Sequence, residues 1–289
     1  MRSGTASHTA VDNALVRALD ARRPAAQRIA NDHLAVHFLP VGYRILVETA
    51  RVAWVRRAAE AVIDAGWPGP RRGVVARTRH IDELIGRRAE SVDQVLILGA
   101  GFDTRAYRVA ALQRVPVFEV DHPSTQMSKR RVLDRAVKGG ASNVTFAPVD
   151  FLIDDVGDVL RSEGFVTGVR TFVLWEGVTN YLNAGAVDAM FAFLADSVAS
   201  ASPVVFTYVD IAMIDGTASF DGASQSKRRV GRQGEPFTFG LDPLEVPAFL
   251  RERGFELVDD VAVPALVERY YGVAQESYAY YHVVDARRV

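Results

Sequence analysis

Cysteine is absent from the 289 residues of this chain, and its absence excludes several kinds of chemistry at once. Disulfide bonds, thiolate nucleophiles and cysteine metal sites all depend on that residue. Long apolar runs are missing too, since no stretch approaches the roughly 18 uncharged apolar residues that a membrane span requires. The first 20 residues also lack the apolar run of a signal peptide. We therefore expect a cytoplasmic protein.

An excess of charge of either sign is also lacking, because 34 basic and 35 acidic residues give a formal net charge of −1. Nucleic-acid-binding proteins usually carry a basic face, so we expect a small organic partner instead, and no membrane or nucleic acid. His33 and His37 have the i, i+4 spacing of a helical metal site, but they lack an HExxH glutamate and a nearby third ligand. We expect no bound metal, and the oligomeric state stays open.

The chain is organised around residues 95–107, which read as a strand, a glycine turn and the start of a helix. Four branched apolar residues, Val95 to Leu98, suit a parallel strand that is covered on both faces. The turn that follows can approach a ligand closely because glycine has no Cβ, and it places a cofactor at the carboxyl end of the strand. The residues expected to contact that cofactor are Gly99, Ala100, Gly101, Asp103 and Thr104.

A second predicted strand, residues 115–121, ends in an acid 22 positions after Gly99, at Asp121. A carboxylate at that place can accept both hydroxyls of a ribose, as in the dinucleotide-binding fingerprint. The full GxGxxG is missing, however, because Thr104 stands where the third glycine would be. The turn therefore fits a nucleoside without phosphates better than NAD, and S-adenosylmethionine is the common cofactor of that description.

Four segments together resemble a known family: LILGAGFDTRAYR (96–108), FEVDHP (118–123), the later Asp150, and WEGVTNYL (175–182). They are similar to the signatures of the leucine carboxyl methyltransferase family, in the bacterial branch that includes polyketide carboxyl methyltransferases. The resemblance runs from Thr9 to Pro243. It implies an α/β fold with a Rossmann-like class I methyltransferase sheet, mostly parallel with an antiparallel last strand, an N-terminal helical lid, and S-adenosylmethionine as cofactor.

Residues 1–90 show helical patterns and no strand-like alternation, so we expect a helical cap before a core domain of residues 91–289. One helix should begin near Tyr43, bury a stripe that includes Val47 and Trp54, and end before Gly66. Another should cover residues 75–89. The cap is either a stabilising layer or, as the resemblance implies, a lid that closes over cofactor and substrate.

Two arginines of this cap, Arg77 and Arg79, stand two positions apart. Surface arginines are usually solvated or paired with acids, but an arginine near a lid can also bind a carboxylate through two hydrogen bonds. The resemblance implies that Arg77 holds the methionine carboxylate of the cofactor. Arg79 is then available for the substrate.

Strands and helices alternate from Leu96 onward, a pattern typical of a parallel sheet. The predicted helix over residues 123–137 carries Lys129, Arg130 and Arg131, which we interpret as a solvated face. The next strand ends at Asp150, which either accepts the exocyclic amine of adenine or caps a helix, and Phe151 can cover the ring. Further strands are expected at residues 171–177 and 203–210, with an antiparallel pair at 255–263 and 277–285.

Glu176 follows a predicted strand and is itself followed by Tyr181, so both fall where methyl transfer would occur. A carboxylate at a buried edge needs a polar partner, and the matching glutamate of the family lines the cofactor pocket. The segment of about residues 211–240 is rich in Gly, Ser and Arg, and we expect a flexible substrate wall there.

The predicted reaction is O-methyl transfer to a small metabolite, with Glu176, Tyr181 and Arg79 as the catalytic candidates. A carboxylate acceptor is already ionised at pH 7 and needs orientation but no base. A hydroxyl acceptor needs a base, and the candidates His80 and His122 are more often structural residues. The alternatives are a hydroxyl-directed methyltransferase, an NAD-dependent oxidoreductase and a non-catalytic cofactor-binding protein.

Overall fold

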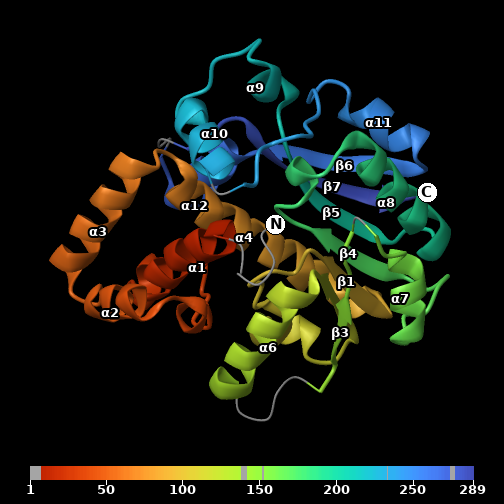
Figure 1. The fold of residues 1–289 in the computed structure, drawn as a ribbon, viewed down its shortest axis with the longest axis horizontal. Coiled ribbons are helices and arrows are strands. Elements are labelled where there is room, and N and C mark those ends of the chain that lie inside the picture. The colour runs from red at the N-terminus through yellow and green to blue at the C-terminus, as the bar shows by residue number, and fades with distance from the viewer. Residues whose placement is uncertain (1–7, 138–141, 152, 233, 274–276) are drawn as a thin grey trace.

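The protein folds around one seven-stranded sheet in the order β3-β2-β1-β4-β5-β7-β6 (Figure 1). The computed structural model describes residues 8–137, 142–151, 153–232, 234–273 and 277–289. Within the sheet β1 to β5 are parallel, and β7 lies antiparallel between β5 and β6. The strands are β1 Gln94–Leu98, β2 Val117–Asp121, β3 Val144–Pro148, β4 Thr171–Trp175, β5 Pro203–Val209, β6 Phe255–Ala262 and β7 Tyr281–Arg288. The predicted sheet, including its antiparallel pair, is confirmed.

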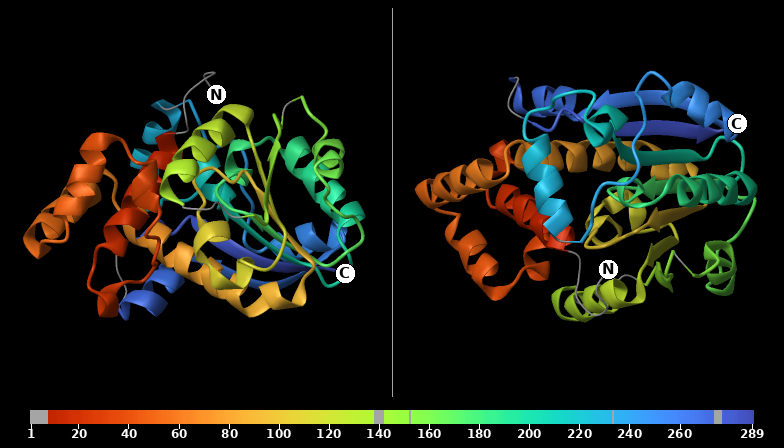
Figure 2. Two further views of the ribbon diagram at one scale, coloured as in Figure 1. Left: turned by 90° about the horizontal axis from the view of Figure 1, so that it is seen from below. Right: turned by 45° about the horizontal axis from the view of Figure 1, so that its top comes forward.

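Helices cover both faces of this sheet, and in the described part of the chain four α-helices precede the first strand (Figures 1 and 2). These four are α1 His8–Ala21, α2 Val41–Thr49, α3 Ala53–Gly66 and α4 Pro70–Arg88. The later helices are α5 Arg105–Arg108, α6 Pro123–Ala136, α7 Val156–Ser162, α8 Ala184–Ser197, α9 Ile211–Asp215, α10 Ala223–Arg232, α11 Val246–Glu252 and α12 Val263–Tyr271. Residues 1–7 of the expected cap lie outside the described residues.

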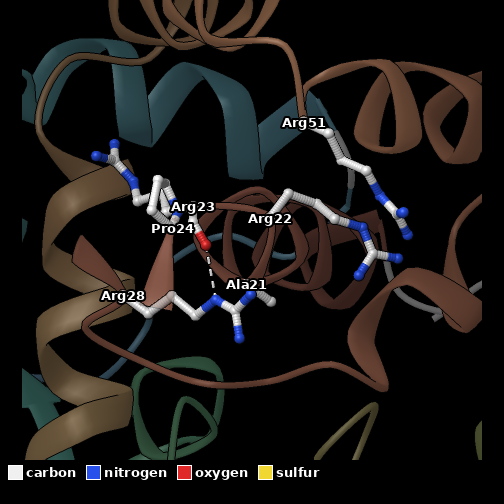
Figure 3. A pocket seen from close by; sticks show the side chains of 6 residues that line it. All are labelled: Ala21, Arg22, Arg23, Pro24, Arg28 and Arg51. Atoms are coloured by element: carbon white, nitrogen blue, oxygen red, sulfur yellow. Dashed lines mark hydrogen bonds between the residues drawn. The ribbon is translucent and has the colours of Figure 1, made fainter. Parts of the chain in front are cut away.

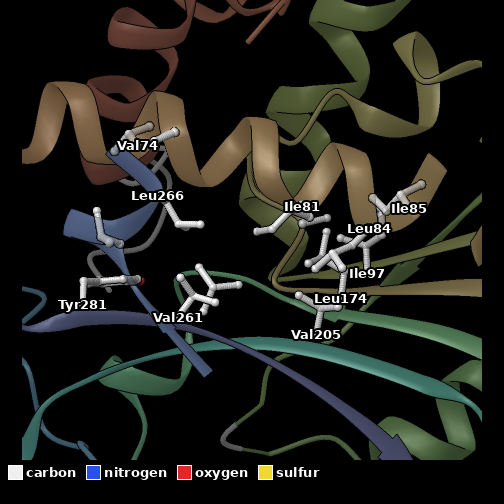
Figure 4. Packing of buried hydrophobic residues seen from close by; sticks show 14 of the residues in the cluster. Val74, Ile81, Leu84, Ile85, Ile97, Leu174, Val205, Val261, Leu266 and Tyr281 are labelled. Atoms are coloured by element: carbon white, nitrogen blue, oxygen red, sulfur yellow. The ribbon is translucent and has the colours of Figure 1, made fainter. Parts of the chain in front are cut away.

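Alternate residues of β1 enter two separate apolar clusters, as expected for a strand that is buried on both faces. Val95 and Ile97 join the cluster under α4 and α12, whereas Leu96 and Leu98 join the cluster under α8 and α11. Figure 4 shows the first cluster, in which side chains of α4 point down onto those of the central strands. The long helix α4 therefore has a fixed position against the sheet, and Arg77 lies within it.

A single helix from Tyr43 to Gly66 is not observed, because the chain breaks between α2 and α3. The hydroxyl of Thr49 donates to the carbonyls of Ile45 and Leu46, a local bond that competes with continuation of the helix. The predicted stripe therefore divides: Val47 is fully buried, while Trp54 is 72% exposed.

The expected cap is joined to the glycine turn by aromatic packing. Phe38 and Phe102 stack with ring centroids 4.8 Å apart, inside a cluster that also contains residues of α1, α2 and α6. By contrast, α2 and α3 extend away from the sheet on the far side of α1 (Figures 1 and 2). Among the described residues, no helix is long and apolar enough to cross a bilayer.

The segment of residues 211–240 contains the helices α9 and α10, although its composition predicted a flexible loop. Tertiary contacts explain the difference. Ser226 accepts hydrogen bonds from the Trp67 indole (3.1 Å) and from the Tyr280 hydroxyl (2.7 Å), and Arg229 pairs with Asp12 of α1 at 2.7 Å. Residue 233 of the segment lies outside the described residues.

Candidate active site

The carboxyl ends of the parallel strands bring the predicted cofactor residues to one edge of the sheet. Leu98 lies opposite Val120, and Asp121 lies opposite Pro148. The ladder extends past the strands, since Ala100 N donates to Val120 O and Val149 N donates to Asp121 O, both at 2.9 Å. The glycine turn, Asp121 and Asp150 therefore meet at the same edge.

The two glycines of the turn both require their residue type, for partly different reasons. Gly99 has φ +64°, and an added Cβ would lie 2.3 Å from Cγ2 of Val178. The close approach at this position is thus made by the loop after β4. Gly101 has φ +42°, and an added Cβ would meet no atom nearer than Gly99 O at 3.8 Å. The backbone at Gly101 is open on the side where a ligand would approach.

Asp121 is anchored by the backbone around it. One carboxylate oxygen accepts from the N–H of Gly101, and the other accepts from the N–H of His122 at 2.6 Å. Burial raises the pKa of Asp121, and these two hydrogen bonds oppose that rise without cancelling it. Each carboxylate oxygen has two acceptor positions, so each retains capacity for one further donor. A pair of ribose hydroxyls fits this donor and acceptor balance.

Lys129 lies behind Asp121 and does not belong to a solvated face, contrary to the expectation for the helix of residues 123–137. Its Nζ lies 2.7 Å from the carboxylate of Glu119, and both side chains are only 1% exposed. Burial raises the pKa of Glu119 to about 7 even though Lys129 opposes the shift. The sequence did not reveal this pair. The position of Glu119 within an apolar strand indicates burial, but nothing in the sequence indicates which basic residue it pairs with.

Asp150 and His122 lie together at the rim of the same edge. His122 Nε2 is 3.7 Å from the Asp150 carboxylate, and His122 Nδ1 lies 2.8 Å from the Ser124 hydroxyl. Phe151 is partly buried against the cluster under α8. The structure thus places His122 at the end where Asp150 and Phe151 lie, beside β2 and β3, and not beside the residues that follow β4.

Glu176, directly after β4, is the centre of a buried ion-pair network. Its two oxygens accept from Arg77 Nε and from Arg105 Nη1, each at 2.6 Å. Burial alone would raise the pKa of this carboxyl, but Arg105 and Arg77 lower it to about 2. Glu176 is therefore a carboxylate throughout the physiological range and a very weak base.

The network continues from Glu176 toward α1 with charges that alternate in sign. Arg105 also pairs with Asp103 at 2.5 Å and with Asp82 at 2.8 Å. The members beyond these are Arg108, Asp32 and Arg17. Thr104 accepts from Arg108 Nε at 2.9 Å. Asp103 and Thr104, predicted as cofactor contacts, thus have protein partners in this structure.

Aromatic side chains from distant parts of the chain complete this end of the site. Arg77 donates to the Tyr278 hydroxyl at 3.1 Å and lies over the Tyr281 ring, 4.8 Å from its centroid. Tyr181 stacks on Phe237 with centroids 5.7 Å apart. Burial raises the pKa of Tyr181, although hydrogen bonding to Thr9 of α1 opposes the rise. The phenol therefore keeps its proton at neutral pH.

Two of the predicted functional residues are not brought into this cluster. Arg79 points to solvent on α4 and pairs with Glu83 one turn later at 2.6 Å. Arg77 and Arg79 are two residues apart on a helix, so they lie on different faces, because residues on one face are three or four positions apart. His80 lies 3.4 Å from the Tyr270 hydroxyl, on the side of α4 that packs against α12.

Several members of the cluster have no role predicted from the sequence. Arg105 is one of them, yet its position between three carboxylates makes it central to the network. The available signal is the recurrence of arginines and acids in residues 77–82 and 103–108. Tyr278 and Tyr281 gave no signal, because a tyrosine beside a strand has many ordinary uses.

A separate hollow of about 440 Å³ lies at the end of α1 and is lined largely by arginines (Figure 3). Three of these arginines have acidic partners: Arg22 and Arg51 pair with Glu48, and Arg23 pairs with Glu60. Arg28 donates to the carbonyl of Arg23 at 2.7 Å. Acidic partners therefore offset part of the positive charge of this hollow, and the predicted cofactor residues do not line it.

Sequence comparison finds a family and close relatives for this chain. The profile of the leucine carboxyl methyltransferase family matches residues 10–195. A Mycobacteroides abscessus protein, whose name places it among S-adenosyl-L-methionine-dependent methyltransferases, is 33% identical over 275 residues, covering 90% of this chain and 84% of the relative. A similarly named Streptomyces coelicolor protein is 34% identical over 206 residues, covering 69% and 68% of the two chains.

Solved structures share the fold at low sequence identity. A Thermobifida fusca protein described as a methyltransferase superposes with a TM-score of 0.60 at 16% identity, covering 99% of this chain and 96% of the other. A Streptomyces avermitilis protein of the DUF574 family gives a TM-score of 0.57 at 15% identity, covering 81% and 91% of the two chains.

These matches decide between the enzyme classes that the glycine turn had left open. The family profile spans more than half of the chain, and the M. abscessus relative aligns over most of both lengths. The nicotinamide oxidoreductase and the non-catalytic protein are therefore not supported. The strand order, the glycine turn and the acid at the end of β2 all agree with these matches, and this S-adenosylmethionine-dependent methyltransferase belongs to the leucine carboxyl methyltransferase family.

Proposed function

We propose that this methyltransferase acts on a carboxylate of a small metabolite and forms a methyl ester, in natural-product biosynthesis. One observation carries the choice of acceptor: Glu176 and Tyr181, which lie at the methyl-transfer end, are both unsuited to remove a proton. Glu176 has a pKa near 2, and the raised pKa of Tyr181 keeps the phenol protonated. A hydroxyl acceptor needs a base in contact with it, whereas a carboxylate needs none.

S-adenosylmethionine supplies an electrophilic methyl group that is already activated by the sulfonium. The residues at the sheet edge fit that cofactor part by part. Asp121 binds the ribose hydroxyls with its remaining acceptor positions, and the open backbone at Gly101 passes beneath the nucleoside. Asp150 accepts the exocyclic amine of adenine, and Phe151 covers the ring.

Arg77 binds the methionine carboxylate of the cofactor, and Glu176 fixes the direction of its guanidinium. Hydrogen bonds to Glu176, Tyr278 and Tyr281 use three of the five N–H donors of Arg77, which leaves donors for a ligand. Arg105 positions Glu176 from the other side. Tyr181 orients the acceptor carboxylate toward the methyl group by donating its phenolic hydrogen bond to it, in place of the bond that Tyr181 makes with Thr9 in this structure.

The cofactor assignment is tested by calorimetric titration with S-adenosylhomocysteine, with NADH as the control ligand. Asp121→Asn should weaken binding of S-adenosylhomocysteine by about 1–3 kcal/mol, as expected when a buried charged acceptor is lost. Asp150→Asn is the matched variant at the rim, and a smaller loss is expected there because its side chain is more exposed. Unchanged affinity in Asp121→Asn would overturn the ribose assignment.

The acceptor is tested with S-adenosylmethionine labelled in the methyl group and a panel of carboxylic acids and matched alcohols. Methyl esters hydrolyse in mild alkali and release labelled methanol, whereas methyl ethers do not. We expect base-labile product from acids only, at a rate that stays level between pH 8 and pH 6. Base-stable product, or a rate that falls as the pH is lowered from 8 to 6, would favour a hydroxyl acceptor with a general base instead.

A further inference from the structure

An apolar cleft separates α1 from the arm formed by α2 and α3. Its volume is about 490 Å³, within the range of about 300–1,000 Å³ typical of small-molecule sites. The lining side chains are mainly aliphatic and aromatic: Leu15, Val16, Tyr43, Leu46, Trp54, Val55, Ala58, Ala59, Val62, Ile63 and Trp67. Among the described residues that line the cleft, the ionisable side chains besides Tyr43 are Asp12 and Arg229, which pair with each other.

Several of these apolar side chains remain exposed to water. Trp54 is 72% exposed and Val62 is 73% exposed, on the same helix. Leaving such groups in water forfeits about 25 cal/mol for each Å² that could be buried. An exposed apolar surface that is also concave is typical of a ligand site.

The cleft begins close to the methyl-transfer end of the site. Thr9 of α1 hydrogen-bonds to Tyr181 and donates to Glu235 at 2.7 Å, whereas Asp12, three residues later, lines the cleft. Three residues of a helix advance about 4.5 Å along its axis. Val16 then forms part of the cleft and also joins the core cluster that contains Tyr281.

We propose that this cleft binds the apolar body of the methyl acceptor while the reacting carboxylate lies at Tyr181. The acceptor class is therefore an organic acid with a long alkyl or fused aromatic portion. The carboxylate of this acceptor rests on the proposed function. Its apolar body is inferred from the cleft alone. The polar pair of Asp12 and Arg229, with Arg229 also stacked 5.0 Å from the Trp67 ring, bounds the cleft beside α10.

The cleft carries its own optical reporter, because Trp54 and Trp67 line it and the third tryptophan, Trp175, is buried in β4. We would titrate the full chain with dodecanoate and with anthracene-2-carboxylate, in the presence of S-adenosylhomocysteine, and follow tryptophan fluorescence. Hexanoate serves as the short control acid. At least one long acid should change the fluorescence and bind tenfold or more tightly than hexanoate, from about 0.8 kcal/mol per additional buried CH₂.

Ala58→Phe fills the cleft, and Ala61→Phe adds the same bulk to an exposed position of α3 that does not line it. Ala58→Phe should weaken binding of the long acid roughly tenfold or more relative to Ala61→Phe, with equal affinity for S-adenosylhomocysteine in both. Equal acid affinity in the two variants, or no fluorescence response to either acid, would overturn the inference.

Two further outcomes separate this inference from the carboxylate proposal. Ester formation from short acids only, at the same rate in both variants, would overturn the cleft as acceptor site and leave the carboxylate proposal standing. Binding of a long acid in the cleft without any ester would overturn the carboxylate proposal and still support the cleft as an apolar binding site. A dimer in sedimentation, with no response to either acid, would assign the surface to a second copy of the chain instead.

Discussion

Globular proteins usually bury apolar side chains and expose charged ones. The carboxyl edge of the sheet departs from this rule by burying charges, and the arm of α2 and α3 departs from it by exposing apolar side chains. At the edge, four arginines and four acids lie largely buried in one network, and they come from α1, the connection between α1 and α2, α4, the glycine turn with α5, and the residue after β4. In the arm, Trp54 and Val62 are left in water. Globular proteins rarely bury charge or expose large apolar groups in a cluster without a functional reason.

The difference is consistent with the two different ligands that we propose for these regions. Buried arginines held by fixed carboxylates keep their geometry without solvent reorganisation, which suits a charged cofactor that every turnover requires. An open apolar surface suits an acceptor that is recognised by apolar contacts and not by ion pairs. Ion pairs between opposite charges therefore hold the first region in a fixed geometry. The second region instead exposes apolar side chains that can pack against a ligand.

The largest expected effect comes from removing a centre of the network. Arg105→Leu leaves Glu176, Asp103 and Asp82 short of a buried partner, and it should lower the free energy of unfolding by about 3–5 kcal/mol in urea titrations. Arg79→Leu, the matched change at an exposed ion pair on α4, should cost no more than about 1 kcal/mol. Equal losses in the two variants would show that the network does not hold this edge together.

The acid dependence of stability tests the same network through its carboxylate. The pKa of Glu176 falls from an ordinary 4.5 to about 2 in the folded protein. A depressed pKa contributes stability above pH 4.5 that is lost as the pH falls toward 2, by about 3 kcal/mol for this shift. Glu176→Gln should be less stable at pH 7 and should lack this part of the acid-induced loss. Parallel stability curves for the two proteins between pH 4.5 and 2 would contradict the assignment.

A smaller effect is expected at the glycine turn, where the edge meets the loop after β4. Gly99→Ala places a Cβ against Val178 at a residue with φ +64°, so strain of about 1–3 kcal/mol should appear in stability and in binding of S-adenosylhomocysteine. Val178→Ala should restore part of the loss in the double variant, because the clashing methyl group is removed. A double variant no better than Gly99→Ala would place all of the cost in the backbone angle.

The smallest effect belongs to the arm. Trp54→Ala should change the free energy of unfolding by no more than about 0.5 kcal/mol, because the ring is 72% exposed. Trp175→Ala, the same substitution at a fully buried strand position, should cost about 3–5 kcal/mol. A large loss in Trp54→Ala would mean that the arm is packed for stability, and this would weaken the contrast between the two regions.

The strands and the cofactor edge were predictable because their signals are local. An apolar run, a glycine turn and an acid at the end of the next strand occupy short stretches, and parallel strands must bring their carboxyl ends together. The family resemblance added Arg77 and Glu176, which the structure joins at 2.6 Å. The break between α2 and α3 was not predictable from periodicity, because the apolar spacing of Val47 and Trp54 continues across it.

By itself the sequence determined the sheet, the position of the glycine turn, the acid at Asp121 and the family, since each depends on the order of residues along short segments. Only the tertiary structure decided that Lys129 is buried against Glu119, that Arg79 points to solvent, and that Tyr281 lies beneath Arg77. These outcomes depend on which faces of separate elements meet. Whether a charged side chain is buried and which partner it pairs with depend on how these faces pack, and the residue type alone does not specify either.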